Sequence, residues 1–162
     1  MSTLSSLDYV RAFSQAAEKV LEQLLGEKPV RGTPSFQLGA TLQLQQVNAI
    51  VGLTGGVKGQ IAYGMDKQTA LAVAGAMMME EVTALDEMGI SALSELSNMI
   101  SGNATVILSQ SGAVSDITPP SVVMGSSVMA AWYGIRAMVM PLKLSLGTLY
   151  VTVGLRPKLN SH

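Results

Sequence analysis

The stretch Ser91-Ala-Leu-Ser-Glu95-Leu-Ser-Asn98-Met-Ile-Ser-Gly102-Asn103 carries Ser91, Glu95, Asn98 and Gly102 in a regular register. At about 100° per residue, these four positions fall within roughly a 60° arc of one helix face. Apolar residues fall on the opposite side of the same helix: Leu93, Leu96, Ile100, Ala104 and Ile107. The pattern therefore predicts a helix that buries one face and presents a carboxylate and a carboxamide side by side on the other.

The composition of the chain excludes several kinds of chemistry. There is no Cys, and the only His is His162 at the C-terminal position, so thiol catalysis, disulfides and zinc clusters are excluded and histidine acid–base catalysis is not expected. With 10 Lys and Arg against 11 Asp and Glu, the chain has no net basic field that would attract a phosphate backbone. We expect no nucleic-acid partner.

The length of 162 residues suits one domain, with a core expected over about residues 6–156. The mean hydropathy of +0.37 is high, and the uncharged stretches 96–115 and 117–135 are long enough to raise the question of a membrane span. Polar residues interrupt the first stretch and Pro119-Pro120 interrupts the second, so we expect no membrane insertion. The N-terminus lacks the basic and apolar regions of a secretory signal, which predicts a cytoplasmic protein.

The periodicity of the first half predicts one helix followed by strands. Apolar residues recur with helical spacing over 6–25, and Gly26 is a plausible stop. Residues 36–44 alternate between apolar and polar types, as in a half-buried strand. Two further strands are expected over 47–53 and 61–65, joined by a turn at Thr54-Gly55-Gly56, and the three strands together predict an antiparallel meander.

The second half predicts two helices and a hairpin. Asp66 can cap a helix from Lys67 to about Met77, and the pattern Thr83-x-x-Asp86 resembles a capping box for a helix from Ala84 to about Ser111, ended by Gly112. Pro119-Pro120 forbids helix, so residues 117–124 should be extended, as in an edge strand.

Residues 132–146 and 149–155 read as two long strands joined at Gly147, and Pro141 in the first indicates an edge or a bulge there. Strands on both sides of a helical block, joined by hairpins rather than crossovers, indicate a mixed α/β (α+β) domain. Its sheet should be largely antiparallel, with the N-terminal helix and the long motif-bearing helix packed on it.

Two other patterns have simpler explanations than a ligand site. Gly52-x-x-Gly55-Gly56-x-x-Gly59 lacks the Gly-Lys-Ser/Thr ending of a phosphate loop and is better explained as a hairpin turn. The pairs Glu80-Glu81 and Asp86-Glu87 suggest a divalent metal, but carboxylates near a helix start are usually favourable partners of the helix dipole. We expect no metal or cofactor bound by this chain.

The motif stretch resembles the signature of the CheC/CheX/FliY family of bacterial chemotaxis phosphatases, and its flanks are similar to the CheX branch. The resemblance extends from about residue 6 to 155. It includes three further stretches: Gly52-Leu-Thr-Gly-Gly56 with Gly59, Ala74-Gly-Ala-Met-Met78, and Asp116-Ile-Thr-Pro-Pro-Ser-Val-Val-Met-Gly125. It implies a protein, usually a homodimer through its sheets, that removes the aspartyl phosphate of the phosphorylated response regulator CheY, whose receiver domain supplies Mg²⁺ and a lysine.

The resemblance also implies roles for the residues of the motif. Asn98 would orient the attacking water, because an amide offers both a hydrogen-bond donor and an acceptor. Glu95 would pair with the lysine of the regulator and align the helix. Ser91 and Gly102 are candidates for packing and for close approach of the partner, and Asn103 is either a polar residue of the helix face or an additional contact. A binding module that recognises a receiver without turnover is the alternative function.

Overall fold

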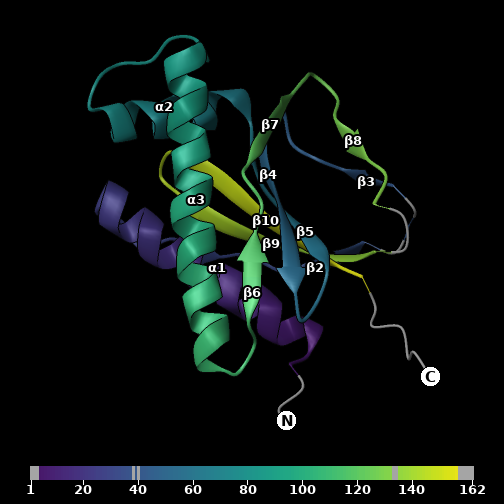
Figure 1. Cartoon of the computed structure of the whole chain (residues 1–162). Helices are drawn as coiled ribbons and strands as arrows, with labels where there is room; N and C mark the ends of the chain where they lie inside the picture. The colour runs from purple at the N-terminus through teal and green to yellow at the C-terminus, as the bar shows by residue number, and fades with distance from the viewer. Residues whose placement is uncertain (1–3, 38, 40, 133–134, 157–162) are drawn as a thin grey trace, which may run out of the picture.

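An antiparallel sheet with three helices on one face and a two-stranded flap on the other makes up the computed structural model (Figure 1), which describes residues 4–37, 39, 41–132 and 135–156. The helices are α1 (Ser6–Leu25), α2 (Lys67–Met78) and α3 (Glu87–Gln110). The strands of the sheet are β1 (Val30–Arg31), β2 (Ser35–Gln37), β4 (Val47–Gly55), β5 (Gly59–Met65), β6 (Ser115–Ile117), β7 (Ser121–Met124), β9 (Arg136–Leu144) and β10 (Gly147–Leu155). β3 (Leu42–Gln43) and β8 (Met129–Ala130) form the flap. This confirms the mixed α/β class.

Side-chain capping sets where the helices begin. Ser5 and Asp8 form a reciprocal capping box at the start of α1, with Asp8 N donating to Ser5 Oγ at 3.2 Å. Asp66 caps α2 by accepting a hydrogen bond from Thr69 N at 2.7 Å, and this bond lowers the pKa of the Asp66 carboxyl. Gly26 ends α1 with a φ of 68°, as expected from the sequence.

The long helix starts three residues later than the capping pattern predicts. Asp86 is its N-cap, with its carboxylate accepting from Gly89 N at 3.0 Å, so α3 begins at Glu87 and the expected start at Ala84 is wrong. The reason is that Asp86 itself satisfies the free amides of the first turn, which leaves no capping role for Thr83.

The strand predicted over 36–44 is also wrong. Within the described residues it is split between β2, which pairs with β9, and β3, which pairs with β8 in the flap; Leu38 and Ala40 lie outside the described residues. Phe36 is 68% exposed, whereas Leu42 and Leu44 are buried. The meander with β4 therefore does not form, because the alternation indicates which side chains face a core but not which strand supplies the hydrogen bonds.

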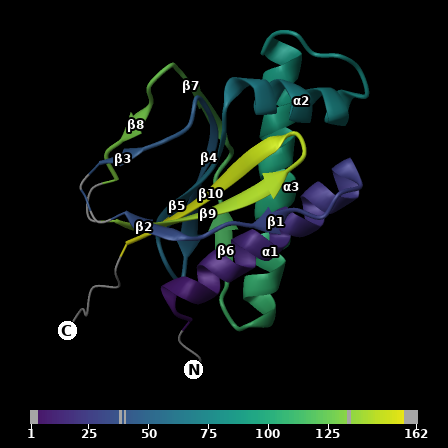
Figure 2. The same ribbon diagram turned by 180° about the vertical axis from the view of Figure 1, so that it is seen from behind.

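The order β1-β9-β10-β5-β4-β6 places the two predicted hairpins at the centre of the sheet, with β6 and β7 both on the outer side of β4 (Figure 2). The extended edge predicted for 117–124 is confirmed, although Pro119-Pro120 divides it into two strands. β9 begins at Arg136 rather than at Trp132.

Pro141 lies at neither an edge nor a bulge. β9 pairs with β10 in continuous register and lies between β10 and the strands β1 and β2. Pro141 O accepts a hydrogen bond from Gly32 N at 2.8 Å. Because the nitrogen and the oxygen of one residue in an antiparallel strand point to the same side, the nitrogen of Pro141 also faces the interruption between β1 and β2. The missing N–H of the proline is thus accommodated where the outer neighbour has no strand.

The main core lies between the sheet and the helices. It is built from α1, the inner face of α3 and the facing side chains of the central strands, including Phe13, Tyr63 and Val151. A smaller cluster around Trp132, Leu42 and Leu44 lies under the flap, on the opposite face of the sheet. No helix in the described part of the chain has the length and apolar character that a membrane span requires. Because the main core buries the inner face of α3, it fixes this helix with its other face outward.

Candidate functional site

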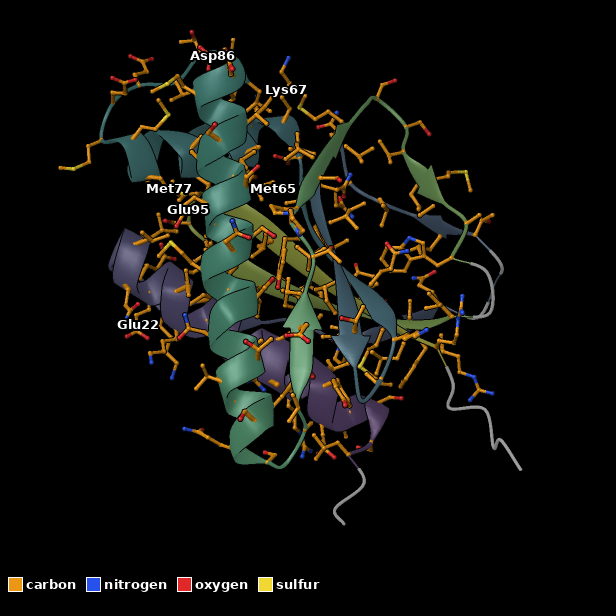
Figure 3. All side chains as sticks on the ribbon, in the orientation of Figure 1. Glu22, Met65, Lys67, Met77, Asp86 and Glu95 are labelled. Carbon is orange, nitrogen blue, oxygen red and sulfur yellow. The ribbon has the colours of Figure 1, made fainter. Side chains whose placement is uncertain are left out.

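The polar residues of the motif lie together on the outward face of α3. Ser91, Glu95, Asn98 and Gly102 are all exposed, while the residues predicted for the opposite side are buried or partly buried. Figure 3 shows α3 in front of the sheet, with Glu95 labelled about a third of the way along the helix from Asp86. The face predicted from the sequence is therefore confirmed as a surface, and Glu95 and Asn98 lie one turn apart on it.

The side chains of Glu95 and Asn98 are not used by the fold. Within the described residues neither side chain takes part in an ion pair or a hydrogen bond. The ion pair found among those residues lies elsewhere in the fold and joins Arg31 of β1 to Glu18 of α1. On a rigid helix, a free carboxylate can accept hydrogen bonds from a second molecule, and a free amide can both accept and donate them, without first breaking an internal hydrogen bond. They are available for recognition.

Buried hydroxyls fix the other side of α3. Tyr63 from β5 and Ser101 from α3 share a hydrogen bond of 2.8 Å beneath the helix, and both side chains are almost fully buried. Burial raises the pKa of the Tyr63 phenol, and the bond to Ser101 only partly opposes this rise, so the phenol stays neutral. Because only one rotation of α3 brings Ser101 to Tyr63, this bond helps to hold Asn98, one turn away, on the outside.

Gly102 leaves open space on the exposed face. No heavy atom lies within 4 Å of where a Cβ on Gly102 would stand, so the fold of the free protein does not require glycine there. Glycine in a helix interior is less favourable than alanine by about 1 kcal/mol. The absence of a structural reason fits the prediction that this position allows close approach of a partner.

Asn103 lies off this face and is half-buried. Its Nδ2 donates to Met99 O at 2.8 Å, so the amide folds back along its own helix. Of the two roles that the sequence left open for Asn103, the structure favours a polar residue of the helix, because it lies beside the exposed face and its NH₂ group already donates to the backbone of the same helix.

A groove runs along α3 that the sequence pattern did not reveal. It has a volume of about 430 Å³ and is lined by Asn98, Gly102 and Thr105 on one side and by residues 115–120 on the other. β6 reaches this position by pairing with β4, more than fifty residues earlier in the chain. The Asp116-Ile-Thr-Pro-Pro stretch stood out in the sequence, but no local signal placed it beside Asn98.

No metal centre can be assigned within the described part of the chain, where no three His, Cys, Asp or Glu side chains come together. The acidic pairs of residues 80–87 lie around the start of α3, where Asp86 serves as a helix cap. The carboxylate of Glu95 and the amide of Asn98 are the polar groups that the sequence pattern predicted for the exposed face of α3.

Comparison with known proteins agrees with this geometry. Residues 47–143 match the family described as chemotaxis phosphatase CheX. The chain is 35% identical over 127 residues to the CheY-P phosphatase CheX of Thermotoga maritima, an alignment that covers 78% of this chain and 81% of the relative.

Two crystal structures extend the likeness to the whole fold. A chemotaxis protein CheX from Desulfovibrio desulfuricans is 30% identical with a TM-score of 0.82, and covers 91% of this chain and 98% of its own. The CheX chain matched in the CheX–CheY–BeF₃–Mg²⁺ complex from Borrelia burgdorferi is 33% identical with a TM-score of 0.74, covering 91% and 97%. With its exposed Glu95 and Asn98 on α3, this chain belongs to the CheX family of chemotaxis phosphatases.

Proposed function

We propose that this protein is a phosphatase that hydrolyses the aspartyl phosphate of a CheY-like response regulator in chemotaxis signalling. Two relatives support the choice of substrate: the Thermotoga maritima protein is named a CheY-P phosphatase, and the Borrelia burgdorferi protein forms a complex with CheY. The observation that carries the proposal is the pair Glu95 and Asn98: both are exposed, neither makes a hydrogen bond or ion pair within the part of the chain that the structure describes, and the other face of their helix is buried in the core.

Asn98 is proposed to orient the attacking water. Its carbonyl accepts a hydrogen bond from the water and its NH₂ group donates one, which fixes the water in line with the bond between phosphorus and the aspartyl oxygen. Attack by the water oxygen forms a new P–O bond while the bond between phosphorus and the aspartyl oxygen breaks. The aspartyl group leaves as a carboxylate, and the inorganic phosphate that is released keeps the protons of the water. The Mg²⁺ of a receiver domain supplies charge stabilisation on the phosphoryl oxygens, so this chain needs no metal of its own.

Glu95 is proposed to dock the receiver. A carboxylate one turn from Asn98 can form a charge-assisted hydrogen bond with the lysine beside the phosphorylation site, which sets the position of the helix over the acyl phosphate. Ser91 and Gly102 extend the contact at the two ends of the exposed face, with Gly102 allowing the partner backbone close. Asn103 supports this face from the side through its bond to Met99.

The test is phosphate release from a phosphorylated receiver in the presence of catalytic amounts of this protein. We expect multiple turnovers by the wild type and a steep loss in Asn98→Ala. Glu95→Gln should raise KM and lower the rate, because loss of alignment also affects chemistry. The alternative, a receiver-binding module, predicts a stable complex with no acceleration of release, and that result would reject a phosphatase.

We propose in addition that the protein is a homodimer that works in the cytoplasm. Exposed apolar residues at the β1–β2 side of the sheet support self-association, since Val30 is 65% and Phe36 68% exposed. Light scattering after size-exclusion chromatography should give twice the mass of one chain, and cell fractionation should find the protein with soluble cytoplasmic markers. A monomer at micromolar concentration would contradict the proposed homodimer.

A further inference from the structure

The exposed residues of α3 form one stripe that is longer than the motif. From residue 88 to residue 108, the exposed residues of this helix are Met88, Ser91, Glu95, Asn98, Gly102 and Val106. Their spacing of three or four residues keeps them on one side of the helix. Figure 1 shows α3 along the front of the molecule, with no other element in front of it. This exposed stripe is therefore open to a partner along its whole length.

The two ends of the exposed stripe are apolar. Met88 is 64% exposed and Val106 is 57% exposed, although the opposite face of their helix is packed in the core. They are 18 residues apart, which is about five full turns, so they lie on one line about 27 Å apart along the helix axis. A lone exposed apolar side chain needs no explanation. Two that are aligned on the face carrying the proposed site indicate a contact made there.

Glu95 and Asn98 lie midway between these two apolar residues. Glu95 follows Met88 by seven residues, and Val106 follows Asn98 by eight, which places each apolar residue about 11 to 12 Å along the axis from the nearer polar one. A standard protein interface of about 800 Å² on each partner is about 30 Å across. A receiver centred on Glu95 and Asn98 would therefore reach both ends of the exposed stripe.

Apolar contacts at the two ends would supply what the polar pair lacks. An ion pair or hydrogen bond on an exposed surface contributes little net binding energy, because water competes for both partners. Burial of apolar surface is free of that competition, and methionine is enriched in interfaces, where its side chain adapts to irregular surfaces. Side chains that exclude water would also strengthen the proposed contact between Glu95 and the lysine of the receiver.

We propose that Met88 and Val106 are apolar anchors for the receiver, one on each side of Glu95 and Asn98, and that each packs on apolar side chains of the receiver beside its acyl-phosphate pocket. This inference rests on the proposed function, since it names how the same partner is held. The anchors lie away from the reacting atoms, so they contribute equally before and during phosphoryl transfer. Their loss should therefore raise Kd and KM and leave kcat unchanged.

The occupant of the exposed stripe is the receiver rather than a second copy of this chain. A second copy seated there would cover Glu95 and Asn98 and close the proposed site. The exposed apolar residues proposed for self-association, Val30 and Phe36, lie on β1 and β2 instead (Figure 2). Self-association through those strands leaves the outer face of α3 free.

The experiment replaces each anchor by a polar residue of similar shape. Met88→Gln keeps the length and helix propensity of the side chain, Val106→Thr keeps its branched shape, and neither changes the net charge. Receiver activated with BeF₃⁻ and Mg²⁺ is titrated into each variant, and phosphate release is measured with phosphorylated receiver from low to saturating concentration. We expect Kd and KM to rise about five-fold in Met88→Gln and about three-fold in Val106→Thr. The double variant should lose about fifteen-fold, because distant sites act independently.

Met129→Gln is the matched control. Met129 is 61% exposed on β8 of the flap, which lies on the other face of the sheet from α3, and it undergoes the same chemical change as Met88 (Figure 1). This variant should bind and turn over the receiver as the wild type does. In about 0.5 M salt the rise in KM of Met88→Gln should persist, because salt does not screen apolar contacts, whereas that of Glu95→Gln should shrink.

Four results would overturn the proposal. They are wild-type Kd and KM in either anchor variant, an equal loss in Met129→Gln, a rise in Met88→Gln that disappears in high salt, and a changed mass of the assembly with unchanged receiver affinity. The last result, measured by light scattering, would make a second copy the occupant. Circular dichroism should show the wild-type unfolding midpoint in every variant, because the replaced side chains are exposed.

The two proposals fail in different ways. If the wild type accelerates phosphate release and the anchor variants match it, the anchor proposal is wrong and the phosphatase stands. If the wild type binds the activated receiver with the expected dependence on Met88 and Val106 but does not accelerate release, the phosphatase is wrong and the anchor proposal stands. If the wild type neither binds nor accelerates, both are wrong.

Discussion

The two faces of α3 differ in what holds their side chains. On the inner face, Leu96 and Ile100 are sealed against the sheet, and the buried Ser101 shares its hydrogen bond with Tyr63. On the outer face, Glu95 and Asn98 are exposed and make no hydrogen bond or ion pair with any other described residue. Because the inner face fixes the position of the helix, the outer face needs no contacts of its own to be held in place. Stability is therefore carried by the inner face of the helix, while the proposed recognition of a receiver uses different residues on its outer face.

The largest effect is expected on the inner face, from Ile100→Ala. Ile100 is fully buried in the main core, so loss of its side chain should lower the free energy of unfolding by about 2 to 5 kcal/mol. Denaturant unfolding followed by circular dichroism measures this loss. A change below 1 kcal/mol would mean that the inner face does not hold the helix as described.

The outer face should respond in activity instead. Asn98→Ala should lower kcat for phosphate release by about 10²-fold, equal to about 2.7 kcal/mol of transition-state stabilisation. Its free energy of unfolding should stay within about 0.5 kcal/mol of wild type, since the side chain is exposed and unbonded. The phosphate-release assay measures the change in kcat, and denaturant unfolding measures the free energy of unfolding. Near-normal turnover would reject water orientation by this amide.

A smaller effect is expected at the bond that joins α3 to the sheet. Tyr63→Phe should destabilise the protein by about 1 to 2 kcal/mol, because it removes one buried hydroxyl and leaves Ser101 without its partner. In a double-mutant cycle with Ser101→Ala, the two losses should not add, since both remove the same hydrogen bond. Additive losses would show that the two hydroxyls contribute independently.

The smallest effect is expected at Gly102, and it should have opposite signs for stability and for recognition. Gly102→Ala should raise the free energy of unfolding by about 1 kcal/mol, because the helix gains a better helix former in open space. The added methyl group should raise KM for the phosphorylated receiver if the partner backbone lies against this position. Greater stability with an unchanged KM would confirm the open space and reject the close approach.

Local features of the fold were largely predictable. The ends of α1, the cap at Asp66 and the hairpins β4–β5 and β9–β10 depend on residues close in sequence, such as Gly26 or the turn at Gly55. The outward face of α3 was predictable for the same reason, since helical geometry alone brings Glu95 and Asn98 together. The late start of α3 shows the limit, because Thr83 and Asp86, three residues apart, are both suitable cap residues and the local pattern does not decide between them.

Long-range pairing was not predictable from the pattern. Residues 36–44 alternate like one strand, yet Phe36 pairs with Met138 and Leu42 pairs with Ala130 in a different sheet. Pro141 appeared to indicate an edge, but the interruption of the neighbouring strand accommodates it inside the sheet. Alternation and proline specify what a backbone can do, whereas the choice of neighbour depends on packing across the whole domain.

The amino-acid sequence by itself determined which residues stand on the exposed face of α3, because a helix converts spacing into direction without help from the rest of the chain. Only the tertiary structure decided what stands beside that face. The wall formed by Asp116 and Thr118 reaches α3 through the pairing of β6 with β4, and the Tyr63–Ser101 bond that sets the rotation of the helix joins residues 38 positions apart. Such contacts form only when the buried core brings distant segments together, so no local pattern specifies them.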